Sequence, residues 1–355
     1  MSSRRAFFKD AASAAGIVSC GCCFADAARA FQQAASTSRR PVTLGGRRIK
    51  VIDFHAHCAV PEAMALMGRK PSAQDPLILG PGRLREMDEQ RIDVAALSIN
   101  PYWYAAERDL AGRIIQLQNE KLAELCAAHP DRFVAFASVA LQHPDLAAAQ
   151  LEEGVKKLGL RGAMIGGSVN GEELSAPRFE PFWAKAESLG VPVFIHPQGV
   201  PELQKRLAGN GLLTNVIGNP LETTIALSHL IFDGTLDRFP ALKICAAHGG
   251  GYLPSYADRS DHGCPTFPSA CTKTLQKRPT EYLKQLYFDS LVFTGEALRH
   301  LVAQCGASQI VLGSDWPYPW NSTSVDHVLA TPSLSDAERE AILSGNARKL
   351  LRIDS

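Results

Sequence analysis

Residues 51–57 read VIDFHAH, an apolar and β-branched run that ends in two histidines, His55 and His57. The run predicts a buried strand, on which side chains at positions i and i+2 point to the same face. The two imidazoles can therefore converge on one ion, and neutral imidazole is a good ligand for zinc and its neighbours. An open dinucleotide-binding sheet would instead carry a glycine-rich phosphate loop after its first strand.

Three later apolar runs also end in residues that can bind a metal, namely His196, His248 and Asp315. The carboxyl ends of parallel strands meet at one face, so we expect all five side chains to gather there. A carboxylate at the end of a strand as apolar as residues 310–312 is costly to bury without a partner. A metal ion or a charged neighbour is therefore expected beside Asp315.

Short apolar runs alternate with longer amphipathic segments from Lys50 onward, which is the pattern of repeated βα units. Strands are predicted over residues 51–54, 94–99, 133–139, 162–165, 193–196, 244–248, 287–290 and 310–314. Helices are predicted over residues 108–129, 146–158, 179–189, 220–232, 296–304 and 336–351, the last with Ser335 as its N-cap. Eight such strands predict an α/β fold, the (β/α)8 TIM barrel, with a mononuclear metal site at its C-terminal face.

Two insertions, residues 58–82 and 255–279, are expected to be irregular and to lie over the barrel mouth. The glycines at 249–251 remove side chains beside His248, which we expect to let a substrate approach closely. Aromatic residues after two strands suggest walls for a flat or cyclic ligand: Trp103, Tyr104, Trp316, Tyr318 and Trp320.

The first thirty residues differ from the rest of the chain. Arg4 and Arg5 precede a Phe pair and an Ala-rich stretch, and residues 28–30 offer a small-x-small cleavage site. This pattern predicts a twin-arginine (Tat) signal peptide over residues 1–30, hence export to the periplasm through the Tat machinery. A chance arginine pair on a helix, or a lipid-anchored form through Cys20, are the alternatives. Residues 31–48 are expected to be a flexible linker, and residues 49–355 the barrel domain.

The composition is that of an ordinary globular protein. The 355 residues are 46% hydrophobic and 21% charged, and the net charge is +1. Mixed charge gives no case for binding nucleic acid or an anionic membrane. Among the cysteines beyond the signal, only Cys264 and Cys271 lie close enough in one loop to pair, and the sequence leaves their pairing open.

The four strand-end motifs together resemble the amidohydrolase superfamily. The likeness is greatest to the branch that contains 2-amino-3-carboxymuconate-6-semialdehyde decarboxylase and aromatic-acid decarboxylases. It rests on residues 53–57 (DFHAH), 195–197 (IHP), 247–251 (AHGGG) and 312–317 (LGSDWP), and also on 84–88 (LREMD), 220–223 (PLET), 288–290 (FDS) and 345–347 (GNA).

The resemblance implies a role for each site residue. His55, His57, His196 and Asp315 would bind one divalent metal, zinc in first place and manganese as the alternative. His248 would act as acid and base on a metal-bound water, and Asp315 would be catalytic as well as a ligand. The implied reaction is decarboxylation of an unsaturated or aromatic carboxylic acid, and the implied assembly is a homodimer.

Other functions remain open from the sequence alone. The same site could hydrolyse a lactone, ester or amide, and a binding or metal-storage protein is a third reading. The chain also departs from the muconate enzyme, in which two arginines hold the substrate carboxylate. The first insertion offers only Arg69 and Lys70 in a different context, and no basic cluster follows Arg259.

Overall fold

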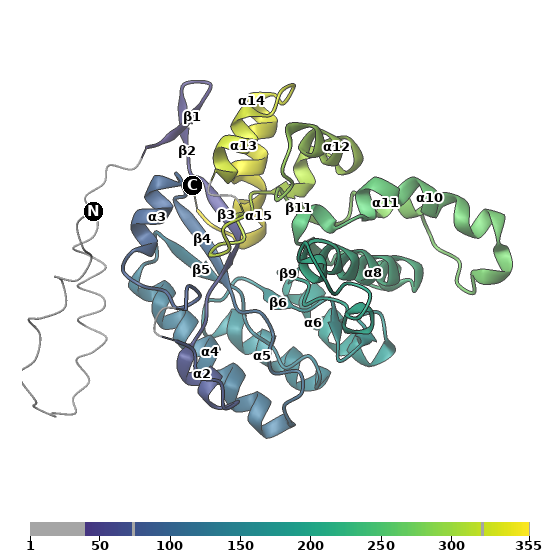
Figure 1. Ribbon diagram of the computed structural model, residues 1–355, viewed down its shortest axis with the longest axis horizontal. Helices are drawn as coiled ribbons and strands as arrows, with labels where there is room; N and C mark the ends of the chain where they lie inside the picture. Colours follow the sequence, from purple (N-terminus) through teal and green to yellow (C-terminus); the bar gives the residue numbers. More distant parts are fainter. Residues whose placement is uncertain (1–39, 73–74, 321–322, 355) are drawn as a thin grey trace, which may run out of the picture.

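The structure of the protein is a computed structural model that describes residues 40–72, 75–320 and 323–354 (Figure 1). The predicted signal peptide, with Cys20, and residues 31–39 of the predicted linker lie outside the described residues. In the described part of the chain, no helix has both the length and the apolar character needed to cross a bilayer.

Eight parallel strands make a closed barrel in the order of the sequence, which confirms the predicted (β/α)8 fold. They are β3 (Ile52–His57), β4 (Val94–Ser98), β5 (Phe133–Ala135), β6 (Ala163–Ile165), β9 (Pro192–Ile195), β10 (Lys243–Ala246), β11 (Tyr287–Asp289) and β12 (Ile310–Val311). Three form the sheet β3-β4-β5, and five form the sheet β12-β11-β10-β9-β6. Isolated parallel bridges join the two sheets at both seams, Ala56 to Trp316 and Ala137 to Ala163.

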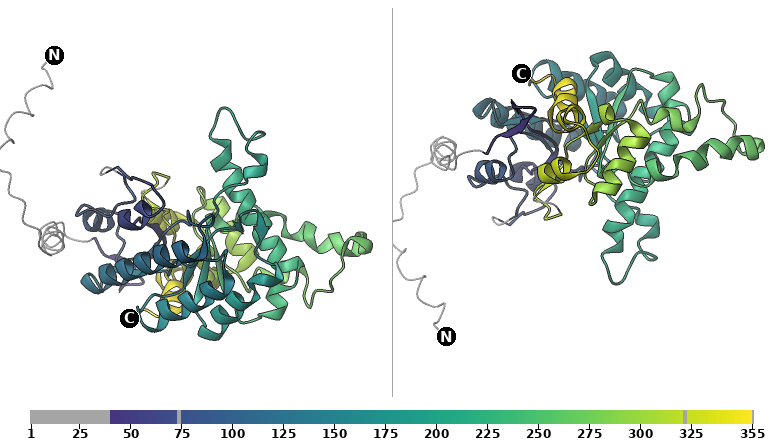
Figure 2. Two further views of the ribbon diagram at one scale, coloured as in Figure 1. Left: turned by 90° about the horizontal axis from the view of Figure 1, so that it is seen from below. Right: turned by 90° about the horizontal axis from the view of Figure 1, so that it is seen from above.

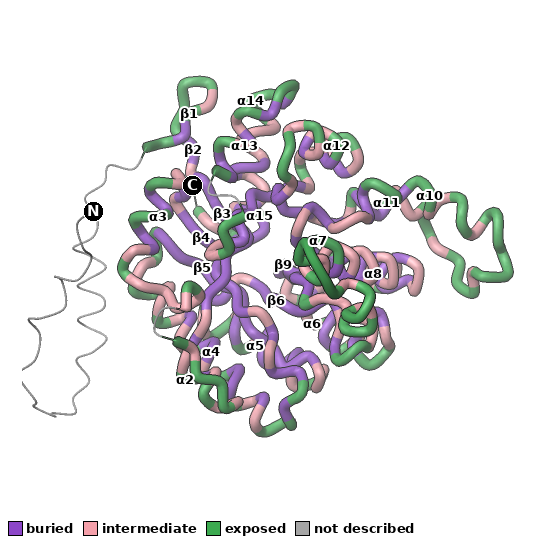
Figure 3. The backbone as a smooth tube through the Cα atoms, in the orientation of Figure 1, coloured by how far each residue is buried: buried purple, intermediate pink, exposed green. Residues whose placement is uncertain are grey.

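Helices surround the barrel and cover the outer face of its strands (Figure 1). They are α2 (Pro61–Ala65), α3 (Arg83–Glu89), α4 (Arg108–Ala128), α5 (Pro144–Lys156), α6 (Glu180–Leu189), α7 (Leu213–Val216), α8 (Gly218–Phe232), α9 (Thr235–Arg238), α10 (Leu253–Thr266), α11 (Pro279–Tyr282), α12 (Gly295–Cys305), α13 (Ser324–Ala330), α14 (Asp336–Glu340) and α15 (Asn346–Leu351). The strands are buried almost throughout, whereas exposure is concentrated in the outer helices and loops (Figure 3).

An irregularity in strand pairing changes the direction of side chains on β3, the first strand of the barrel. The register between β3 and β4 shifts between Asp53 and Ala56, and such irregularities re-aim side chains. As a result both Phe54 and His55 contact the ring of Phe194, with ring centroids 5.7 and 4.9 Å apart. Phe54 fills the barrel interior while the next residue reaches its mouth.

The predicted helix over residues 336–351 is divided by one π-helical turn, Ala341–Gly345. Ser335 caps its start as predicted, accepting the N–H of Glu338. Within the π-turn, the Ile342 carbonyl accepts the N–H of Leu312, 2.9 Å away. The Asn346 side chain in the GNA motif donates to the Ile310 carbonyl, so this C-terminal segment braces β12 from outside.

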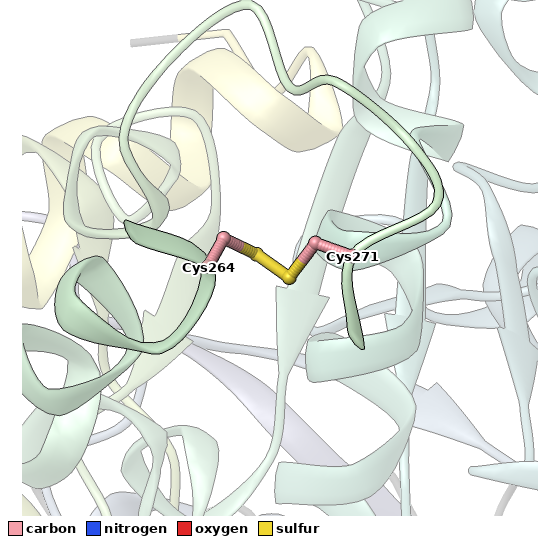
Figure 4. Close-up of a disulfide and its surroundings, with 2 residues drawn as sticks. All are labelled: Cys264 and Cys271. Atoms are coloured by element: carbon pink, nitrogen blue, oxygen red, sulfur yellow. A yellow bond between two sulfur atoms is a disulfide. The ribbon is translucent and has the colours of Figure 1, made fainter. Parts of the chain in front are cut away.

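Two expectations about irregular segments are wrong. Residues 42–49, of which 42–48 were placed in the flexible linker, form an antiparallel hairpin of β1 (Val42–Leu44) and β2 (Arg47–Ile49) that buries Val42. The first half of the second insertion belongs to the helix α10, and residues 253–279 form an arm that stands off the barrel (Figure 2). Cys264 and Cys271 form a disulfide that closes the turn of this arm (Figure 4).

Candidate metal centre and active-site cavity

Four side chains predicted as metal ligands meet at the C-terminal mouth of the barrel. His55 and His57 come from β3, His196 follows β9, and Asp315 follows β12. One donor atom from each lies within 4.8 Å of every other, and all four residues are buried. The four therefore come from both sheets of the barrel and face one another across its mouth.

These donor atoms lie close enough together to bind one ion. His55 Nε2 is 3.0 Å from His57 Nε2, and both are about as far from Asp315 Oδ1, at 3.0 and 2.9 Å. Donor atoms about 2.0–2.2 Å from a tetrahedral ion stand roughly 3.3 Å apart, so these three atoms are only slightly closer together than the ligands of one ion. Among the described residues, His196 has no hydrogen-bond partner at either buried ring nitrogen, which a ligand position at Nε2 would supply.

Neighbouring side chains fix the tautomers of the first two histidines. Asp289 can only accept, so His55 Nδ1–H donates to its Oδ2 at 2.6 Å and leaves Nε2 free for a metal. Ser98 Oγ donates its single proton to the Ala56 carbonyl and therefore accepts from His57 Nδ1–H at 3.1 Å. In its neutral form, each of the two imidazoles thus presents an unprotonated Nε2 to the site.

The buried carboxylates around the site favour a bound cation. Burial lowers the pKa of His57 and of His196, which keeps both rings neutral as ligands must be. Burial also works against charge on His55, but the carboxylates of Asp315 and Asp289 outweigh it and raise its pKa to about 10. Without a metal, these carboxylates therefore hold a proton on His55, and a divalent ion can supply the same positive charge.

A second buried carboxylate, Asp53, ties the two ligand-bearing segments together. It accepts the N–H of His55 at 3.1 Å, and the N–H and hydroxyl of Ser314 at 3.0 and 2.5 Å. Asp315 itself has a left-handed backbone, with φ of 58°, a conformation that non-glycine residues seldom adopt. The Asp53 bonds, together with the bond from the Asp315 N–H to the His55 carbonyl, hold it in place.

His248 lies beside the four ligands rather than among them. Its Nε2 is 3.4 Å from Asp315 Oδ2, the oxygen that does not face His55 and His57. Asp289 accepts the backbone N–H of His248 at 3.0 Å and that of Gly249 at 2.8 Å. The same carboxylate therefore orients a candidate ligand and the candidate acid/base.

The glycines after His248 serve packing rather than substrate approach. A Cβ atom on Gly250 would stand 2.5 Å from the Phe288 ring, and one on Gly251 would stand 2.1 Å from the Pro220 carbonyl oxygen. Both residues have positive φ, at 78° and 65°. The chain turns sharply here against β11 and α8, and only glycine fits.

A cavity of about 980 Å³ opens from the site to the surface. We call the part formed by His196, His248 and Asp315 the metal end. We call the part lined by Arg69, Leu212, Tyr318 and Trp320 the outer rim. The exposed fractions are 59% at Leu212, 39% at Tyr318 and 38% at Trp320, against 3% at Asp315.

Only some of the predicted aromatic walls lie on the cavity. Tyr104, Tyr318 and Trp320 line it, whereas Trp103 is fully buried and donates its indole N–H to the Val139 carbonyl. Trp316 also turns away and covers the buried guanidinium of Arg83, 4.0 Å from its ring centroid. Trp103 therefore packs in the core, whereas Trp316 is half-buried and donates its indole N–H to Glu86.

Two functional residues were missed by sequence reasoning. Asp289 ends the seventh strand, just as Asp315 follows the eighth, so the same argument from a buried carboxylate would have singled it out. The same argument applies to Asp53 within the apolar run of residues 51–54, but its partner Ser314 lies 261 positions away and could not be named from the sequence. The structure also places Arg69 in the cavity, its guanidinium 4.8 Å from the Tyr102 ring centroid.

Comparison with known proteins shows which family and which proteins the chain is similar to. An amidohydrolase family model matches residues 52–353. A 2-amino-3-carboxymuconate-6-semialdehyde decarboxylase from Dictyostelium discoideum is 32% identical over 307 residues, 85% of each chain. A gamma-resorcylate decarboxylase from Rhodococcus jostii (strain RHA1) is 32% identical over 287 residues, 77% of this chain and 87% of that one.

A solved structure extends the likeness to three dimensions. It is a dihydroxybenzoic acid decarboxylase from Polaromonas sp. JS666 with bound manganese and the inhibitor 2-nitroresorcinol. The TM-score is 0.78 and the identity 28%, over 86% of this chain and 98% of that one. A divalent metal site at the barrel mouth is thus supported by the donor atoms of this chain and by a relative.

Proposed function

The chain belongs to the amidohydrolase family, and we propose that it is a metal-dependent decarboxylase of an aromatic or unsaturated carboxylic acid. One observation carries this proposal: four ligand atoms converge beside His248 at the inner end of an open cavity. Decarboxylation is also the activity of the three relatives described above.

The proposed reaction replaces a carboxylate by a proton. The four ligands would hold a divalent ion, which would supply positive charge for the substrate carboxylate. His248, at the metal end of the cavity, holds the proton at Nε2, and Asp315 Oδ2 at 3.4 Å orients this nitrogen. The proton passes to the substrate carbon that bears the carboxylate, the bond from this carbon to the carboxyl carbon breaks, the electron pair of that bond stays with the rest of the substrate, and CO2 leaves.

The direct test measures products on a panel of aromatic, unsaturated and lactone substrates, before and after chelation. Release of CO2 that stops on chelation and returns with added metal is the expected result. Acid release without CO2 would replace the decarboxylase by the hydrolase that the same ligands allow. Metal without turnover of any panel member would favour a binding protein.

We propose zinc as the resident ion. Three imidazoles and one carboxylate form a typical ligand set for zinc, whereas manganese binds preferentially to oxygen ligands. The manganese bound in the Polaromonas relative keeps manganese as the competitor. Elemental analysis of protein purified without added metal decides between them.

We propose that the protein is exported through the Tat machinery to the periplasm. Arg4 and Arg5 carry this proposal, and the disulfide between Cys264 and Cys271 is in keeping with an oxidising compartment. Changing both arginines to lysine should retain the chain in the cytoplasm, as fractionation would reveal. Cys20→Ser should leave the fractionation unchanged unless the exported form is lipid-anchored.

We propose a homodimer as the assembly. Tyr256 and Phe267, each 66% exposed, place aromatic surface on the arm around α10, which the barrel leaves uncovered. Sedimentation of the purified chain tests the assembly. A monomer at micromolar concentration would contradict the proposal, and Tyr256→Ser with Phe267→Ser should weaken the dimer if the arm forms its interface.

A further inference from the structure

One motif from the sequence, PLET at residues 220–223, has no part in the proposed chemistry. Its Glu222 lies near the start of α8 and is only 5% exposed. Oε2 of its carboxylate accepts the backbone N–H of Gln198 and that of Gly199, the second at 2.7 Å. Oε1 accepts the hydroxyl of Ser168 at 3.1 Å.

These bonds tie two segments that border the cavity. The first begins at His196 and continues through Gln198, whose side chain lines the cavity and donates to the Pro101 carbonyl. The second follows β6, where a Cβ atom on Gly167 would stand 2.8 Å from Glu222 Cγ. The helix α8 therefore holds the loop after β9 and the connector after β6 against each other through one carboxylate.

The arrangement repeats one found at the metal end. Two successive backbone N–H groups that point at one anion form a concave anion site. Asp289 fills such a site at His248 and Gly249, and Glu222 fills one at Gln198 and Gly199. Asp289 also bonds the candidate ligand His55, whereas the hydrogen bonds of Glu222 go to no ligand side chain.

We propose that Glu222 is a positioning residue for substrate, which fixes Gln198 as part of the cavity wall. Within the part of the chain that the structure describes, Glu222 hydrogen-bonds no candidate ligand side chain and does not line the cavity, so we expect its effect to reach the substrate through the loop it holds. Its loss should therefore weaken substrate binding while metal content and the chemical step persist. The consequence for turnover rests on the proposed decarboxylase function; the consequence for the loop does not.

Three variants test this proposal. Glu222→Ala removes all three bonds, whereas Glu222→Gln keeps an oxygen for the two N–H groups and an amide that can donate to Ser168. Asp233→Asn is the control at the C-terminal end of the same helix, because the hydrogen bonds described for that carboxylate come from Ser175 and His229, which do not line the cavity. Hydrogen exchange of residues 196–199 is measured first, then KM and kcat with metal content.

Glu222→Ala should accelerate exchange in residues 196–199 and raise KM about tenfold or more, with kcat within threefold and one metal per chain. Glu222→Gln should restore most of the protection and of the KM, and Asp233→Asn should resemble the parent. Unchanged exchange in Glu222→Ala, or an equal rise of KM in Asp233→Asn, overturns the proposal. If the parent decarboxylates no acid, the proposed function fails, while the exchange measurement still decides whether Glu222 holds the loop.

Discussion

The metal end and the outer rim of one cavity are built in different ways. At the metal end, each residue follows a barrel strand, and the buried Asp289 holds His248 by accepting its backbone N–H. At the outer rim, Leu212 lies in the loop after β9 and Trp320 in the loop after β12, and their exposed fractions are 59% and 38%. We therefore expect the metal end to determine the reaction and the rim to contribute to the choice of substrate.

The largest effect is expected from breaking the metal end itself. Asp315→Ala removes the ligand whose Oδ1 lies about 3 Å from two imidazoles, so the metal should be lost. Turnover should fall by roughly 10³-fold or more, because the metal carries the charge stabilisation. Elemental analysis and CO2 release check both points. A variant that keeps one metal per chain would remove Asp315 from the ligand set.

The second-largest effect is expected at His248, where a substitution should lower the catalytic rate without removing the metal. His248→Ala should leave the metal bound and lower kcat by about 10²–10⁴-fold, the usual contribution of a positioned acid or base. Metal content and kcat are measured on one preparation, with Asp315→Ala as its counterpart. Activity close to that of the parent would end the assigned role of His248.

A smaller effect is expected from a change at Asp289, which hydrogen-bonds both His55 and the backbone of His248. Asp289→Asn keeps the size of the side chain, but its amide in place of a carboxylate weakens the bond to His55 Nδ1. Metal affinity should fall by about 10–100-fold, as is typical for partners of metal-bound histidines. Competition with a chelator of known affinity gives the number. An unchanged affinity would mean that the strand alone orients His55.

Changes at the outer rim should act on substrate and spare the metal. Trp320→Ala and Leu212→Ser remove apolar surface from the rim, so we expect KM to change by no more than about tenfold. Metal content should remain at one ion per chain. Loss of metal in either variant would show that the outer rim also supports metal binding, which would contradict the proposed difference between the two parts of the cavity.

The smallest effect on activity should come from the arm. Cys264→Ser opens the disulfide across a separation of seven residues, which is worth about 2–3 kcal/mol to the ordering of that loop. Limited proteolysis should become faster near residues 264–271, with kcat/KM within twofold. A large loss of activity would show that the arm reaches the catalytic cavity.

The same contrast explains what could be predicted from the sequence. All eight strands were predicted, and so was the group His55, His57, His196 and Asp315, because strand periodicity places strand-end residues at one mouth. The insertion at 255–279 was expected to be irregular, since its prolines and glycines gave no helical period, yet α10 spans its first half.

Long-range partners account for one further difference. Trp103 and Trp316 were expected at the cavity, but Trp103 is buried and bonds the Val139 carbonyl, and Trp316 is half-buried against Arg83 of α3. The hairpin of residues 42–49 was missed although its signal is local, because Gly45 and Gly46 form the two-residue turn between its strands.

The spacing of the ligands along the chain has a consequence for the order of events during biosynthesis. His57 and Asp315 are 258 positions apart, so the site cannot close until nearly all of the barrel has been made. An early nascent chain offers only two imidazoles, and such an open pair favours whichever metal binds nitrogen most strongly, copper before zinc. For a chain that is exported as proposed above, the metal pool of the compartment in which it folds, rather than of the one to which it is exported, would therefore decide which ion it carries.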